Sequence, residues 1–183
     1  SAATRLLPGA VARLRRHRPG VRVNLRDIDS AAVAQAVAQQ SVDIGIASPS
    51  PMSAGLAEEL LLEDPFVLVC SGDHPIARQG RPAKWSDIDP SEFIANGLCA
   101  NISVAEVAEL AGQAPLMVHN VSSLVAFVSA GYGITLLPKL AISPSFGDLR
   151  AVPLEAVGVS RKLYSFTRPD ETLAPSASAL LAE

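Results

Sequence analysis

The chain has 183 residues, of which 49% are hydrophobic and 18% charged, with a mean hydropathy of +0.28. This composition supports a packed core, argues against a disordered chain, and fits one ordinary domain or two small lobes. Fifteen Lys and Arg against eighteen Asp and Glu give a formal net charge of −3, which disfavours a compact nucleic-acid binder. Two cysteines are too few for a disulfide scaffold, and 4% aromatic residues disfavour a base-stacking platform.

The N-terminal part alternates helical and strand patterns with short connections. This alternation is typical of a parallel sheet with helical crossovers. Apolar residues at helical spacing predict the helices, and alternating apolar and polar residues predict the strands. Asp29 or Ser30 can cap the second helix. The predicted elements are a helix through residues 7–14, ended by Pro19-Gly20, a strand at 21–26, a helix at 31–40 and a strand at 42–46.

A continuous apolar run at 66–70 predicts a buried strand, and a second α/β round follows it. Ser103 and Glu106 form a capping-box pattern that predicts a helix ending at Gly112. The run 110–138 carries no formal charge, but glycine and proline interrupt it, so we expect strand, helix and strand and no membrane span. The other predicted elements are strands at 93–95, 116–118, 134–137, 149–154 and 161–167, and helices from a cap within 120–123 to Ala130 and from Ala174 onward.

The two α/β rounds predict two lobes, because the strands and helix of the tail have no partner round of their own and are expected to rejoin the first half. We place the two chain crossings near Cys70 and Val152. Lobe I would then comprise residues 1–70 and 153–183, and lobe II residues 71–152.

Four motifs follow one another in register along nearly the whole chain. They are residues 1–8 with the basic helix and His17-Arg18-Pro19-Gly20-Val21, then Val42-Asp43-Ile44-Gly45-Ile46, then the strand at 61–69 with Asp73-His74-Pro75-Ile76, and finally the glycine-containing stretch 129–138. In this order they resemble the effector-binding domain of LysR-type transcriptional regulators.

The resemblance implies the fold of type 2 periplasmic binding proteins: two α/β lobes, a two-crossing hinge, and a small-molecule cleft between the lobes. In that family an N-terminal winged helix-turn-helix precedes this domain. It is absent from this chain, as is the first strand expected just before Ser1, so we expect a fragment. The implied partners are a small-molecule effector, further copies in a homo-dimer or tetramer, and DNA only through the missing domain. The resemblance also implies a cytoplasmic protein that uses no cofactor and does not bind a membrane.

Ligands bind doubly wound sheets beyond the carboxyl ends of the strands, where helix N-termini offer free amides to anions. This pattern points to residues 1–4, Asp29-Ser30 and 120–123. The resemblance adds that the hydroxyls of Ser1 and Ser30 contact the effector. The predicted ligand-binding residues are Ser1, Ala2, Thr4, Ser30, Ser48, Pro49, Asn96, Gly97, Leu98 and Ser122. Because these loops hold no Arg or Lys, an organic acid or other polar anion would be bound by amides and hydroxyls.

Each of these residues has a structural alternative. A Ser or Asn at a helix start is more often a plain cap than a ligand contact. Convergence of several on one cleft makes the two roles about equally favoured for Ser1 and Ser30, while Ser122 and Asn96 stay closer to caps. Ser48 could simply open the Ser/Pro loop at 48–55.

Several other features receive structural interpretations. Seven arginines precede the first acidic residue, Asp27, and a solvated face is favoured over a surface for phosphate or an acidic partner. A buried role is favoured over a thiol switch for Cys70 and Cys99. The carboxylates of Glu58-Glu59 and Glu63-Asp64 are interpreted as surface turns.

Enzyme motifs are absent from the sequence, and no two histidines have metal-ligand spacing. We therefore expect a non-enzymatic sensing domain. The second hypothesis is a solute-binding protein of a transporter, which would carry an export signal.

Overall fold

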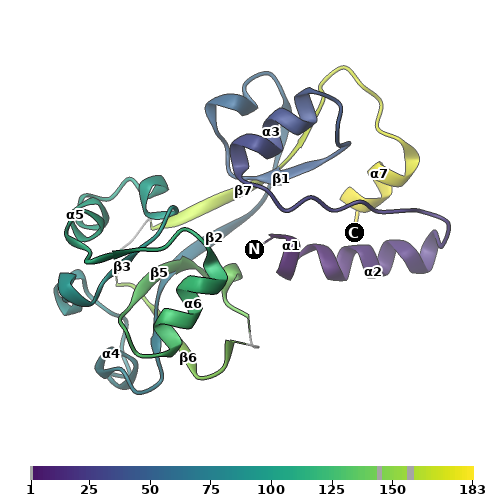
Figure 1. Cartoon of the computed structure of the whole chain (residues 1–183). Coiled ribbons are helices and arrows are strands. Elements are labelled where there is room, and N and C mark those ends of the chain that lie inside the picture. Colours follow the sequence, from purple (N-terminus) through teal and green to yellow (C-terminus); the bar gives the residue numbers. More distant parts are fainter. Residues whose placement is uncertain (1, 144–145, 156–158) are drawn as a thin grey trace. The chain divides into compact units, whose positions relative to one another are not determined.

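The computed structural model describes residues 2–143, 146–155 and 159–183 (Figure 1). The chain forms two compact units: unit 1 is Ser1–Glu63 with Lys162–Glu183, and unit 2 is Asp64–Arg161. Unit 2 is thus a continuous stretch inserted into unit 1. The lobe boundaries expected near Cys70 and Val152 both fall inside unit 2 and stay a prediction, since compactness alone does not fix where a hinge turns.

Unit 1 is built around a short antiparallel strand pair. β1 (Gly45–Ala47) pairs with β7 (Ser160–Thr167), with Ile46 opposite Ser165. Helix α3 (Ser30–Ala38) packs on β1, and Val37, Ala47 and Phe166 form the core. The other helices of unit 1 are α1 (Ala2–Arg5), α2 (Leu7–His17), the 3₁₀ turn η1 (Pro51–Ser53) and α7 (Pro175–Leu181), of which α7 contacts α2 (Figure 1).

The strand predicted at 21–26 is wrong. These residues join no ladder, and Val23, Leu25 and Ile28 are 40%, 52% and 44% exposed. A β-strand needs a neighbour that satisfies its N–H and C=O groups, and no strand of the described residues pairs with this segment. Apolar and polar alternation shows which side chains share a face, but it does not supply the partner.

Unit 2 is built around the second part of β2 (Ala57–Ser71). There β2 pairs antiparallel with β5 (Thr135–Pro138) on one edge and with β6 (Leu149–Pro153) on the other, so Leu68 lies opposite both Leu136 and Val152. The side chains of Leu68, Phe93 and Leu136 are fully buried in its core. The other α-helices and strands among the described residues of unit 2 are α4 (Pro75–Arg78), α5 (Ala105–Gln113), α6 (Val121–Ser129), and the parallel pair β3 (Ile94–Ala95) and β4 (Leu116–Met117) (Figure 1). Unit 2 also contains the 3₁₀ turns η2 (Trp85–Asp87), η3 (Pro90–Glu92), η4 (Cys99–Asn101) and η5 (Lys139–Ala141).

The structure corrects the predicted sheet direction and one cap. The five-stranded sheet is antiparallel in the β1–β7, β2–β5 and β2–β6 pairs, whereas β3 and β4 of the second α/β round pair parallel, as expected. β2 begins at Ala57, nine residues before the predicted Phe66, because its first half is largely exposed and lacks a buried apolar signal. The capping box does not form: α5 starts after Val104, whose side chain makes no cap bond.

The local caps predicted for two other helices are confirmed. The Asp29 carboxylate accepts a hydrogen bond from the amide of Ala32, and the Asn120 side chain accepts from the amides of Ser122 and Ser123. Helix α7 also begins at Pro175, directly after the predicted start. Within the described ranges, no helix is both long and apolar enough to cross a membrane.

Candidate functional site

The predicted residues of unit 1 gather around α3 and the segment after β1. Ser30 is the first residue of α3 and is half-buried. Ser48 and Pro49 follow β1 directly and lead into η1, which packs against α3. The Asp29 side chain uses the amide of Ala32, while the Ser30 hydroxyl donates to no other described residue. The structure therefore brings Ser30 and the Ser48 segment into one region of unit 1.

Ser50 belongs to the same segment but was not among the ligand-binding residues predicted from the sequence. Its Oγ is buried and has no hydrogen-bond partner among the described residues. The neighbouring Ser53 hydroxyl is satisfied, because it donates to the carbonyl of Ser50 at 2.8 Å. A buried hydroxyl without a partner costs free energy. The only sequence signal was its place in a Ser/Pro loop that follows a strand.

The N-terminal candidates lie at the start of α1. Ser1 lies outside the described residues, and so does the side chain of Ala2. Thr4 is exposed in α1. Their contact with an effector stays a prediction.

The predicted residues of unit 2 follow β3, where Asn96 has a structural role. Its side chain is buried, its amide nitrogen donates to Thr135 Oγ1 at 3.0 Å and to the Leu136 carbonyl at 2.9 Å, and its Oδ1 accepts from the Leu98 amide at 2.9 Å. Thr135 in turn donates to the Ile94 carbonyl at 2.7 Å. The Asn96 side chain is thus fully engaged, and it fixes the following loop to β5.

Gly97 and Ser122 are the exposed members of this second group. A Cβ on Gly97 would lie 3.9 Å from His119 Nδ1, so the loop after β3 runs beside the approach to α6. The Ser122 amide donates to the Asn120 cap, whereas its hydroxyl bonds to no other described residue. Unit 2 therefore offers the Gly97 backbone and the Ser122 hydroxyl near one helix N-terminus. Contact between these residues and those of unit 1 stays a prediction.

The chemistry of these regions does not favour redox or metal function. Burial raises the pKa values of the Cys70 and Cys99 thiols, and raised values disfavour the reactive thiolate. Both side chains are buried, in agreement with the structural role predicted for them. The part of the chain that the structure describes contains no group of three or more His, Cys, Asp or Glu side chains able to hold a metal.

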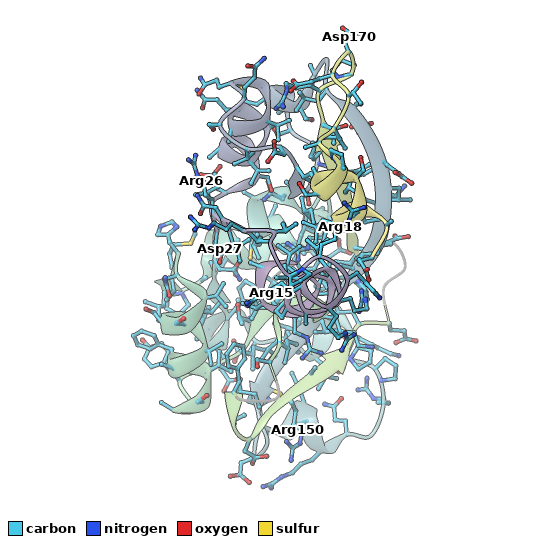
Figure 2. All side chains as sticks on the ribbon, turned by 90° about the vertical axis from the view of Figure 1, so that its right-hand side faces the viewer. Arg15, Arg18, Arg26, Asp27, Arg150 and Asp170 are labelled. Carbon is cyan, nitrogen blue, oxygen red and sulfur yellow. The ribbon has the colours of Figure 1, made fainter. Side chains whose placement is uncertain are left out.

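The arginines before Asp27 lie on the solvent face of unit 1, as predicted. All seven are exposed, and Arg15, Arg18 and Arg26 can be followed on α2 and the segment after it in Figure 2. Arg13 pairs with Glu183 at 2.8 Å and lowers the pKa of that carboxyl.

Asp64 contradicts the prediction of a surface turn. It lies within β2 and is only 1% exposed. Its Oδ2 accepts hydrogen bonds from Arg161 Nε at 3.0 Å and Nη2 at 2.8 Å, and its Oδ1 accepts from the Leu140 amide at 3.0 Å. The neighbouring acidic residues Glu63-Asp64 gave no signal that Asp64 is buried, because Arg161, its cationic partner, lies 97 positions away in the sequence.

Comparisons with known proteins agree on one family. The family model of the LysR substrate binding domain matches residues 1–183. The chain is 32% identical over 166 residues to the "Probable HTH-type transcriptional regulator LrrA" of Synechococcus elongatus, an alignment that covers 86% of this chain and 55% of that protein. The chain thus spans about half the length of that relative.

Two solved structures share the fold. The regulatory domain of CcmR from Synechocystis PCC6803, in complex with 2-PG, has a TM-score of 0.79 at 18% identity and covers 99% of this chain and 89% of its own. The sulfate-bound regulatory domain of an OxyR2 mutant from Vibrio vulnificus has a TM-score of 0.80 at 20% identity, with 97% and 87% covered. The predicted fold class is confirmed, and the relatives favour a regulator over a solute-binding protein. The chain belongs to the LysR substrate-binding domain family.

Proposed function

We propose that the chain is the effector-sensing part of a cytoplasmic LysR-type transcriptional regulator and has no catalytic activity of its own. A small metabolite, an organic acid or other polar anion, binds between its two lobes and changes how an N-terminal winged helix-turn-helix outside this chain binds DNA. The observation that carries the proposal is the family match along all 183 residues, supported by similarity to proteins described as transcriptional regulators.

An anionic effector is supported by the residues available in each unit. Helix N-termini carry partial positive charge and stabilise anions. The Ser30 hydroxyl lies at the start of α3 and that of Ser122 at the start of α6, and neither donates to another described residue. The similar OxyR2 domain was solved with sulfate, a divalent anion.

Calorimetric titration of the 183-residue chain with sulfate, with 2-PG and with a panel of small organic acids tests this proposal. Ser30→Ala and Ser122→Ala each remove one hydroxyl donor and should weaken binding of a responding ligand about tenfold, as expected for a hydrogen bond to a charged group. Ser129→Ala, at the opposite end of α6, is the matched control and should leave the affinity unchanged. Equal affinity in all three variants would contradict the proposed site.

The regulatory part of the proposal needs the full-length protein. A ligand changes DNA binding only when it has different affinities for two arrangements of the protein. Operator affinity measured with and without a tight-binding ligand should therefore differ by about 5- to 150-fold, the usual range of such coupling. Unchanged operator affinity and unchanged promoter output would rule out the regulatory role while leaving the binding site intact.

A homo-dimer or tetramer is the remaining part of the proposal. It is supported by α6, which carries no charged residue and exposes Val121 and Phe127. Tyr132, just after the helix, is 55% exposed and lies edge-to-face with Phe127 at 5.6 Å. Phe127→Glu should shift the mass measured by light scattering toward the monomer. Ser123→Glu on the same helix is the control for added charge alone.

A further inference from the structure

The two connections between the units are strands. The chain enters unit 2 at Asp64, inside β2, and leaves it at Arg161, inside β7. Just within unit 2, the Phe66 amide donates to the Val159 carbonyl at 2.9 Å. Both connectors are thus extended and hydrogen-bonded to each other at the point where they enter unit 2.

The first and last residues of unit 2 form an ion pair whose carboxylate is buried. Asp64 is 1% exposed and the Arg161 side chain 18%, and two nitrogens of the guanidinium donate to Asp64 Oδ2. Asp64 Oδ1 accepts from the amide of Leu140, in the turn after β5. One carboxylate therefore joins both connectors and the body of unit 2. In a buried site such bonds are strong, and an unpaired charge is costly.

We propose that Asp64 is a positioning residue: its pair with Arg161 locks the two connecting strands to each other and to unit 2. Any reorientation of unit 1 then occurs on the unit 1 side of the pair, beyond Glu63 and Lys162, with both connectors moving together. If the chain is the sensing domain proposed above, this lock would make unit 1 rotate as one body on ligand binding, and that single rotation would be passed to the rest of the protein. Without the lock, only backbone hydrogen bonds would hold the two strands to each other.

Pulsed electron–electron double resonance on the 183-residue chain measures how widely the distance between the two units varies. Spin labels at Gln35→Cys in α3 and Ala108→Cys in α5 occupy exposed helical positions in units 1 and 2. The native Cys70 and Cys99 are buried, with raised pKa values, and label poorly. Dilution with excess unlabelled chain removes distances between copies. The measured quantity is the width of the distance distribution between the two labels.

We expect Asp64→Asn and Arg161→Met each to broaden this distribution about twofold, because each leaves only backbone hydrogen bonds between the two connectors. Arg161→Lys keeps a cation and should give a narrower distribution than Arg161→Met. The control is Arg81→Met, which breaks a pair within unit 2 in which two guanidinium nitrogens donate to the two oxygens of Asp87, at 2.8 and 3.0 Å. It should leave the width unchanged.

Widths equal to that of the unsubstituted chain in both Asp64→Asn and Arg161→Met would overturn the proposal, and so would equal broadening in Arg81→Met. Near-UV circular dichroism establishes that each variant keeps its packed core. Should Asp64→Asn fail to fold, Arg161→Met decides alone, because that side chain is partly exposed. No effector is present in the experiment, so its outcome is independent of whether the proposed ligand binds.

Discussion

Unit 2 has a deeper core than unit 1. In unit 2, the two larger hydrophobic clusters surround β2 and include the fully buried Leu68 and Phe93. In unit 1, the cluster of buried residues consists of Val37, Ala47 and Phe166, while Val23 and Leu25 are exposed. Because local stability follows buried apolar contacts, the comparison predicts that unit 1 opens before unit 2.

The largest expected effect comes from truncating one fully buried phenylalanine in each unit. Phe93→Ala and Phe166→Ala should each lower the free energy of unfolding by about 3–5 kcal/mol. In Phe166→Ala, native-state hydrogen exchange should show faster exchange in β1 and β7 while β5 stays protected. In Phe93→Ala, protection should fall throughout. Uniform loss of protection in both variants would contradict the difference between the units.

A second test uses glycines whose Cα atoms lie close to neighbouring segments, so that an added Cβ would clash. A Cβ on Gly133 in unit 2 would lie 2.1 Å from the backbone carbonyl of Glu92, whereas one on Gly45 in unit 1 would meet the Val33 side chain at 2.7 Å. Gly133→Ala should cost about 1–3 kcal/mol in urea unfolding and more than Gly45→Ala, because backbone yields less than a side chain. Gly112→Ala is the control: its Cβ would meet no described atom outside its own helix within 4 Å, so the substitution should be neutral or stabilising.

Helix caps should give smaller effects. Asn120→Ala removes an acceptor for two amides of α6, at 2.9 and 3.2 Å, and Asp29→Ala removes an acceptor for one amide of α3, at 2.9 Å. Each should lower the free energy of unfolding by about 1 kcal/mol, with Asn120 the larger. Asn120→Ser retains a capping oxygen and should recover most of the loss. Thermal melts of the four proteins decide the order.

The smallest effect concerns the carboxylate of Asp87. The hydrogen bonds from Arg81 lower the pKa of Asp87 from 3.8 to about 2. Since the folded-state pKa is the lower one, the stabilisation is present above pH 3.8 and is lost as the pH falls toward 2. Carboxyl NMR titration should find this depressed value, and Arg81→Met should return it toward 3.8. An unchanged pKa in that variant would exclude Arg81 as the cause.

Local signals in the sequence predicted the helices well. The spacing of Leu7, Val11 and Leu14 and the capping residues Asp29 and Asn120 act within a few positions, so α2, α3 and α6 were predictable. Strands depend on partners elsewhere in the chain. The exposed first half of β2 and the unpaired segment at 21–26 were therefore both misassigned.

The candidate site was predictable in its segments but not in its individual side chains. The rule that ligands bind at strand and helix ends points to the segment of Ser30, and the family resemblance adds the segments of Ser48 and Gly97. Contact of these residues with a ligand stays a prediction. The internal hydrogen bonds of Asn96, the unpartnered oxygen of Ser50 and the burial of Asp64 arise from contacts between segments. No pattern of neighbouring residues encodes them.

The discontinuity of unit 1 has a consequence for synthesis. α7 and most of β7, which complete unit 1, follow unit 2 in the chain and are therefore synthesised after it. Domains tend to fold as units during translation. Residues 1–63 therefore cannot complete the fold of unit 1 until residues 162–183 have been synthesised, by which time unit 2 can already be folded.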